Sequence, residues 1–364
     1  MGVTLTTNRR KTIEICQKRV GRGKYALLAG LGLGGTGART SPNTLSKIYW
    51  GISVPKMLYG IETTPTDDAS LNLLEDNHRL SALLIQNLPT LTPRPAATAL
   101  LGWQSLRSFV AYLKVMFMLR VLCLKNDSLY KILMILSIDV FLEQGDKRTL
   151  TPVGDTMQYI KQYGLMEMVQ RCRTSGDWKM IDGLKMKVKS IILRCDENLW
   201  KTSCMLYRGL KIYNESVKYK KLSVWWTFVA KTSGAFKSTS SVMALLCGTQ
   251  PNGYGANFGD KVRCQICSAF AIETFEHTLF ECEGIKETRQ DLLAELYAAM
   301  PLAMRISFRE LSNQEKLTFI LSGLGCETYV REWNDIYHKA CIFIHNVFRD
   351  RVNKYNAFDI GQCD

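Results

Sequence analysis

The feature that most constrains this chain is a set of four residues, Cys264, Cys267, His277 and Cys282, which form a C-x2-C-x9-H-x4-C array. Two thiolates three positions apart can hold one metal ion from a tight turn, and the histidine and the last cysteine can complete a tetrahedron. We call this array the knuckle. Its ligand types favour zinc, and four protein ligands leave no position for a reacting water. The sequence therefore predicts one structural zinc ion.

The other cysteines do not suggest a second metal site or a disulfide framework. Cys326, Cys341 and Cys363 are scattered, and the N-terminus lacks the basic and apolar regions of a secretory signal. We therefore expect reduced thiols in an intracellular protein, cytoplasmic and/or nuclear. Apolar runs such as residues 131–141 are shorter than the roughly 18 uncharged residues that a membrane span needs, so no membrane partner is predicted.

Charge is distributed unevenly along the 364 residues. Residues 1–250 carry 35 Lys and Arg against 17 Asp and Glu, a net charge of +18, whereas residues 251–364 carry 12 against 16, a net charge of −4. A basic surface of this size attracts phosphate backbones without specifying a sequence. An acidic protein partner, or a basic surface that serves solubility alone, is the alternative.

Apolar residues recur at helical spacing along most of the chain, and the alternation typical of strands is scarce. We predict a mainly α fold in four segments: a small three-helix bundle at 1–92, a basic helical linker at 93–250, the knuckle region at 251–300, and C-terminal helices at 301–364 that pack around the knuckle. Helices are expected at 10–28, 46–59, 67–88, 101–124, 154–171, 181–206, 285–300 and 329–352.

Two of the expected helices have an assignable inner face. In the first, Ile13, Cys16, Val20, Tyr25 and Leu28 share helical spacing, opposite a basic face. In the third, Thr66 or Asp67 can cap the N-terminus, and the residues expected to face inward are Leu73, Leu80, Leu84 and Leu88.

A glycine-rich run follows the first helix. It contains a formal G-x-G-x-x-G match at Gly30, Gly32 and Gly35. A dinucleotide site needs this motif after a strand, but here a helix precedes it, so a flexible loop is favoured.

Cations and aromatic rings are interleaved between residues 185 and 237. Lysine and arginine can contact phosphates, and exposed rings can stack on unpaired bases. The alternative for the rings is an ordinary helical core. The candidate contacts to nucleic acid are Arg9, Arg10, Lys11, Lys18, Arg19, Arg22, Lys218, Lys220, Lys221, Trp225 and Trp226.

Several short segments resemble the C-terminal half of the reverse transcriptase polyprotein of non-LTR (LINE-type) retrotransposons. The likeness covers roughly residues 1–105 and 255–325. Residues 48–62 are similar to the thumb segment of that family, and the lead Glu273-Thr274 before His277 is similar to its C-terminal knuckle. The other matching segments are Gly2-Val3-Thr4-Leu5, Leu88-Pro89, Thr92-Pro93 and Leu101-Gly102-Trp103.

The resemblance implies a thumb-like bundle at 1–92 and the handling of template, primer or target DNA. Polymerisation in that family needs a Tyr/Phe-x-Asp-Asp box that holds two metal ions, and this sequence has none. The fingers and palm are expected upstream of Met1, and no restriction-like nuclease arrangement follows the knuckle. We therefore expect a nucleic-acid-binding part of a reverse transcriptase without polymerase or endonuclease activity of its own. The competing hypothesis is a zinc-stabilised interaction module with an acidic partner.

Overall fold

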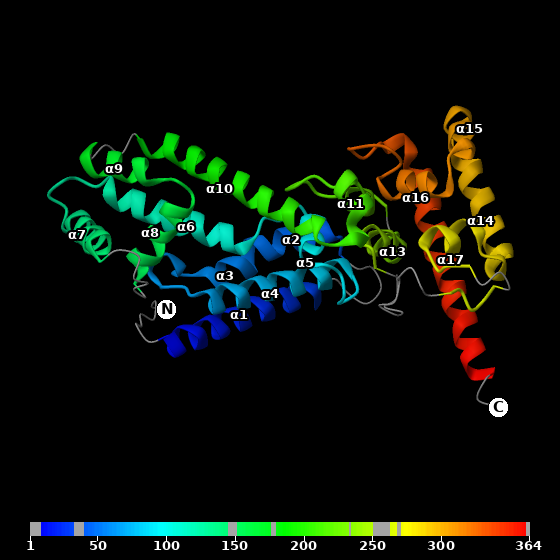
Figure 1. The fold of residues 1–364 in the computed structure, drawn as a ribbon, viewed down its shortest axis with the longest axis horizontal. Helices are drawn as coiled ribbons and strands as arrows, with labels where there is room; N and C mark the ends of the chain where they lie inside the picture. Colours follow the sequence, from blue (N-terminus) through cyan, green and yellow to red (C-terminus); the bar gives the residue numbers. More distant parts are fainter. Residues whose placement is uncertain are drawn as a thin grey trace. The chain divides into compact units, whose positions relative to one another are not determined.

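Figure 1 shows the fold in a computed structural model, which describes residues 9–32, 40–144, 151–175, 180–232, 234–249, 263–267 and 271–361. Helices make up nearly all the regular structure in these ranges, where β-pairing is confined to two isolated bridges, Leu101–Leu222 and Arg263–Ile272. The predicted mainly α fold is therefore confirmed. None of the helices in these ranges has the length and apolar character needed to cross a bilayer.

The chain divides into two compact units that alternate along the sequence. Unit 1 comprises Met1–Gly32, Lys47–Ser81 and Gln104–Thr202, and unit 2 comprises Leu33–Ser46, Ala82–Trp103 and Ser203–Asp364. The four predicted segments were consecutive, whereas both units take residues from each side of the boundary predicted at position 92.

Unit 1 is built from helices that belong to three separate stretches of the sequence. Three helices extend past its boundaries: α2, which begins in unit 2, and α4 and α10, which end there. The helices that lie wholly or partly in unit 1 are α1 (Arg9–Gly32), α2 (Pro42–Ile48), η1 (Tyr49–Ser53), α3 (Val54–Leu58), η2 (Ile61–Thr63), α4 (Asp68–Gln86), α6 (Leu106–Leu122), α7 (Leu129–Glu143), α8 (Pro152–Gln162), α9 (Met166–Ser175) and α10 (Met180–Met205).

Helix α1 packs on α3, and the buried residues of α1 include Cys16, Gly23 and Leu27. A Cβ atom at Gly23 would stand 2.2 Å from the Cγ atom of Met57 in α3, so a larger residue there would force the Met57 side chain to move. The predicted inner face is therefore partly wrong, because Tyr25 is 75% and Leu28 41% exposed. Gly23 is also buried, and a search for large apolar side chains does not find it.

Helix α4 is capped as predicted, since the backbone N–H of Ser70 donates to the Asp67 carboxylate at 2.8 Å. Its inner face differs from the prediction, because Leu80 is 53% and Leu84 48% exposed. The buried face includes His78, whose hydrogen bonds satisfy its polar atoms, and hydrophobic periodicity does not count such a residue. The buried residues of this face include Leu71, Leu74, His78, Ala82 and Ile85.

Helices α6, α7, α8 and α9 enclose a common apolar core in unit 1. The first begins later than the predicted residue 101, because Gly102 has a φ of +70° and the Ser105 hydroxyl caps the helix by accepting from the N–H of Ser108. The helix predicted over 154–171 is two helices, α8 and α9, which are separated by Gly164 at a φ of +66°. Left-handed glycines thus set both helix boundaries.

Unit 2 surrounds its last and longest helix. Its other helices are α5 (Arg94–Ala99), η3 (Arg208–Leu210), α11 (Lys211–Ser216), α12 (Val224–Val229), α13 (Phe236–Leu246), η5 (His277–Glu281), η6 (Glu283–Ile285), α14 (Lys286–Ala299), α15 (Leu302–Glu310), α16 (Asn313–Leu321) and η7 (Arg331–Trp333). Helix α17 (Asn334–Gly361) contacts α12, α13, α14 and the η5–η6 segment. Its apolar residues at helical spacing, from Ile336 to Phe348, are buried.

Candidate metal centre and nucleic-acid interface

The fold brings the four knuckle residues together, although they lie on different local structures. Cys264 and Cys267 lie on a bend after the Arg263–Ile272 bridge, His277 opens η5, and Cys282 follows the last residue of η5. All four side chains are buried, and their potential ligand atoms lie within 4.8 Å of one another. The ligand set predicted from spacing therefore converges in space.

Two separations between ligand atoms match those expected around a tetrahedral zinc ion. Zinc–sulfur bonds of about 2.3 Å and zinc–nitrogen bonds of about 2.0 Å place two sulfurs about 3.8 Å apart and a sulfur and a nitrogen about 3.5 Å apart. The Sγ atoms of Cys264 and Cys282 are 3.8 Å apart, and Cys267 Sγ lies 3.5 Å from His277 Nε2. One ion at the centre of the cluster would thus reach the cysteine sulfurs and Nε2 of His277.

The second ring nitrogen of His277 supports this orientation. Its Nδ1 atom is buried, has no hydrogen-bond partner among the described residues, and lies 3.7 Å from a carboxylate oxygen of Glu281. A carboxylate near the second nitrogen of a metal-binding histidine orients the ring and makes the ligand more basic. Nε2 is therefore the nitrogen that faces the metal position.

Two of the buried thiols, Cys264 and Cys282, interact directly with each other. The Sγ atoms of Cys264 and Cys282 share a hydrogen bond in which either thiol can donate, and this bond lowers the pKa of Cys264 and raises the pKa of Cys282. This hydrogen bond therefore stabilises one thiolate at the expense of the neighbouring one. A bound divalent ion would allow the cysteines to ionise together, because its charge is the largest in such a site.

A buried ion pair attaches the knuckle to α17. Arg351 and Glu273 form this pair with side chains only 4% and 6% exposed, and the Tyr355 hydroxyl donates to the same carboxylate. Tyr355 also accepts from the backbone N–H of Gln265, inside the C-x2-C turn, at 3.3 Å. The packing of C-terminal helices around the knuckle, which we expected, thus has a specific polar basis that the sequence did not reveal.

Two further contacts hold the segment that follows η5. Arg289 of α14 is buried and donates to the carbonyl of Cys282. A Cβ atom at Gly284 would stand 2.1 Å from the carbonyl oxygen of Ile266, so Gly284 permits the close approach of η6 to the C-x2-C turn. These contacts hold the segment that carries Cys282 against α14 and against the C-x2-C turn.

The candidate basic residues of α1 differ in exposure. Lys18 and Arg22 are exposed. Arg9, Arg10 and Lys11 belong to α1, but their side chains lie outside the described residues. Arg19 is only 9% exposed, and its guanidinium donates to the Thr64 hydroxyl at 3.3 Å. The prediction that Arg19 contacts nucleic acid is therefore corrected: this side chain packs inside unit 1.

Lys218, Lys220 and Lys221 form an exposed loop between α11 and α12, which we call the lysine turn. Lys220 has a φ of +57°, and the following Leu222 bridges to Leu101. Gly102 lies beneath this turn, where a Cβ atom would stand 3.0 Å from the backbone nitrogen of Leu222. Backbone pairing therefore keeps the three lysines together on the surface.

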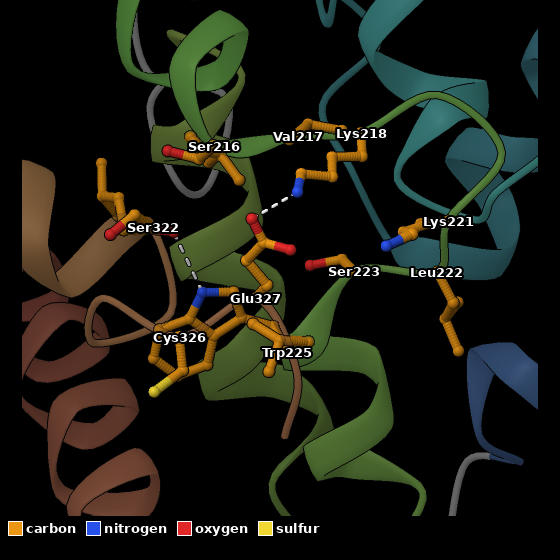
Figure 2. Close-up of a pocket in the computed structure, with 13 residues that line it drawn as sticks. Ser216, Val217, Lys218, Lys221, Leu222, Ser223, Trp225, Ser322, Cys326 and Glu327 are labelled. Carbon is orange, nitrogen blue, oxygen red and sulfur yellow. Dashed lines mark hydrogen bonds and ion pairs between the residues drawn. The ribbon is translucent and has the colours of Figure 1, made fainter. Parts of the chain in front are cut away.

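A carboxylate lies within reach of the lysine turn. Figure 2 shows Lys218 and Lys221 at the rim of a pocket, with Lys218 in an ion pair with Glu327. Hydrogen bonding and charge from Lys218, with a further contribution from the charge of Lys221, lower the pKa of the Glu327 carboxyl. Sequence reasoning missed Glu327, because 109 residues separate it from Lys218.

The two neighbouring tryptophans are core residues. Both indoles are completely buried. Trp225 donates through Nε1 to the carbonyl of Leu321, and Trp226 to the side chain of Gln86. The prediction that these rings stack on bases is therefore wrong for this fold, since neither ring has an exposed face. The alternative reading, an apolar core, applies to both.

Comparison with models of known families, with characterised proteins and with solved structures found no match to this chain.

Proposed function

We propose that the chain is the nucleic-acid-binding C-terminal part of a non-LTR retrotransposon reverse transcriptase. In this role it handles template, primer or target DNA inside the cell, together with fingers and a palm encoded upstream. The observation that carries the proposal is the +18 net charge of residues 1–250, which includes three exposed lysines on one turn. Such a surface attracts phosphates regardless of base sequence.

The knuckle takes a structural role in this proposal. Zinc is the metal we propose, because three cysteines and one histidine at the observed separations match its preferred ligands and bond lengths. The closed ligand set leaves no position for substrate. Because the surrounding residues 251–364 are net acidic, we assign the main phosphate contacts to residues 1–250 and a geometric role to the knuckle.

The test is a salt-dependent binding measurement on the purified full chain. Wild-type protein should bind single-stranded RNA, single-stranded DNA or a hybrid duplex at low salt, with affinity falling as salt rises. Replacing Lys218, Lys220 and Lys221 with Glu should weaken binding and flatten the salt dependence. The matched control replaces Lys286, Lys316 and Lys339, which makes the same change in net charge in the acidic part of the chain. Equal losses in both triple variants, or no binding by wild type, would refute the proposal.

The competing function is a zinc-stabilised module whose basic surface binds an acidic protein. The same variants separate the two, because this alternative does not require loss of nucleic-acid binding from the lysine-turn variant. Primer extension by this chain alone is not expected, since the sequence has no Tyr/Phe-x-Asp-Asp box.

A further inference from the structure

Helix α7 leaves most of its apolar surface exposed. It packs against α6 and α8 in unit 1 (Figure 1), and its fully buried residues are Lys131, Ile138 and Phe141. Large apolar side chains that are 42–73% exposed cover the remainder of the helix: Leu129, Tyr130, Ile132, Leu133, Leu136, Val140 and Leu142. An exposed apolar patch of this density on one helix is typical of an interaction surface.

Four of these residues form a regular line, which we call the α7 stripe: Leu129, Leu133, Leu136 and Val140. Their spacing of four, three and four positions is the heptad seam along which two helices pack side by side. Helices that cross at a single point do not need apolar residues repeated at this spacing along their length. The stripe therefore fits a second helix lying along α7.

The exposed area suits an interface of moderate size. With about half of each side chain exposed, the seven apolar residues present on the order of 500 Å² per copy. A stable interface buries about 800 Å² per partner, including a polar rim. The apolar residues of α7 would thus supply the core of such an interface, and their neighbours would supply the rim.

The chemistry of α7 favours a second copy of the same helix. The stripe contains no charged residue that would select a different sequence, and leucines pack well against leucines across a two-fold axis. The exposed Lys125 precedes α7, the exposed Asp127 lies between Lys125 and the helix, and the exposed Glu143 ends the helix. In an antiparallel pair each lysine comes near the glutamate of the other copy, whereas in a parallel pair like charges meet. We propose that this chain forms a homodimer through the α7 stripe, with the two helices antiparallel.

Sedimentation equilibrium of the full, metal-replete chain tests the proposal. Bound nucleic acid is removed first, and about 1 M salt screens any bridging by residual phosphate. Wild-type protein should be in a concentration-dependent monomer–dimer equilibrium. Leu133→Gln with Leu136→Gln should raise the dissociation constant on the order of 100-fold or more. The matched control is Leu302→Gln with Ile306→Gln on α15, where two apolar residues are also exposed at one helical turn; it should leave the dimer intact.

A charge-reversal pair tests the direction of the helices at low salt. Lys125→Glu alone should weaken the dimer, because it places acidic groups opposite each other, and adding Glu143→Lys should restore it. A wild-type chain that stays monomeric up to about 100 μM overturns the proposal. A dimer that survives the double glutamine variant overturns it as well, and failure of Glu143→Lys to restore the Lys125→Glu variant overturns the antiparallel arrangement. Circular dichroism of each variant verifies that its helices remain folded.

Discussion

Among single residues, Cys264 gives the most direct test of the knuckle. Replacing it with serine removes one sulfur from the buried ligand set and leaves a weaker ligand for zinc. Elemental analysis should find about one zinc per wild-type chain and little or none in Cys264→Ser. Hydrogen exchange should become faster in η5 and the start of α14, because the ion joins these residues to the C-x2-C turn.

Cys326→Ser is the matched control, because Cys326 is a partly exposed cysteine of unit 2 that lies outside the knuckle. It should keep its zinc. His277→Ala should lose zinc in the same way as Cys264→Ser. An undiminished zinc content in both knuckle variants, or wild-type protein without metal after zinc-replete expression, would contradict the assignment.

The convergence of Cys264, Cys267, His277 and Cys282 could be predicted because the signal is local: their spacing is contained in a stretch of 19 residues, from Cys264 to Cys282. The support from Arg351 was not recognisable, since 78 residues separate it from Glu273. The prediction for Trp225 and Trp226 was wrong for a related reason. Aromatic rings among lysines fit both a base-stacking surface and an apolar core, and only the tertiary packing decides between the two.

At the scale of elements, His78 joins three parts of unit 1. Its ring in α4 is completely buried, Nε2 donates to the carbonyl of Gln104 at 3.0 Å, and Nδ1 accepts from the Tyr49 hydroxyl of η1 at 2.8 Å. Burial lowers the pKa of His78 to about 3. The folded protein therefore holds a neutral histidine that links η1, α4 and the segment before α6.

This histidine predicts a specific loss of stability in acid. The unfolded chain binds a proton at His78 with a pKa of about 6.5, whereas the folded chain does not until about pH 3. The contribution of His78 is thus complete above about pH 6.5 and falls by about 1.4 kcal/mol per pH unit below it. Urea unfolding at about pH 7 and about pH 5 should show a larger decrease for wild type than for His78→Gln, by up to about 2 kcal/mol.

His338→Gln is the control for this measurement, because His338 on α17 is only partly buried. If His78→Gln and wild-type protein lose stability equally between the two pH values, His78 is not held neutral in the folded state.

The presence of a helix was easier to predict than the face of the helix that is buried. The long apolar periodicities at 285–300 and 329–352 correspond to α14 and most of α17. A periodicity that repeats over several turns predicts a helix even when single positions do not fit the pattern. The faces of α1 and α4 were misplaced, because the residues packed inside include Gly23 and His78. Glycine is buried for its small size and histidine for its hydrogen bonds, and neither contributes to an apolar pattern.

The organisation of the whole molecule was the least predictable feature. Residues 82–103 belong to unit 2, although they lie between two stretches of unit 1. One reason is visible at Gln86, which accepts a hydrogen bond from Trp226, 140 residues away. Such contacts depend on complementarity between segments that are far apart in the sequence. A prediction from composition along the chain does not detect them and divides the chain into consecutive segments.

The charge of the whole molecule leads to a last prediction, which rests on the proposed nucleic-acid function. Glu327 is an exposed carboxylate that pairs with Lys218 and lies in the field of Lys221. A nucleic-acid phosphate that contacts the lysine turn has to compete with this carboxylate. Glu327→Gln should therefore tighten binding to single-stranded nucleic acid about two- to fivefold at low salt. The measurement is a fluorescence anisotropy titration of the full chain at several salt concentrations.

The control for this change is Glu310→Gln, which removes the same charge from an exposed position at the end of α15. If net charge alone governed affinity, both variants would gain equally, because long-range attraction depends on the sum of charges. If phosphates bind at the lysine turn, only Glu327→Gln should gain substantially, and its salt dependence should become steeper, since lysine charge that Glu327 had neutralised becomes available to release counterions. Equal gains, or a gain confined to Glu310→Gln, would contradict phosphate binding at the lysine turn.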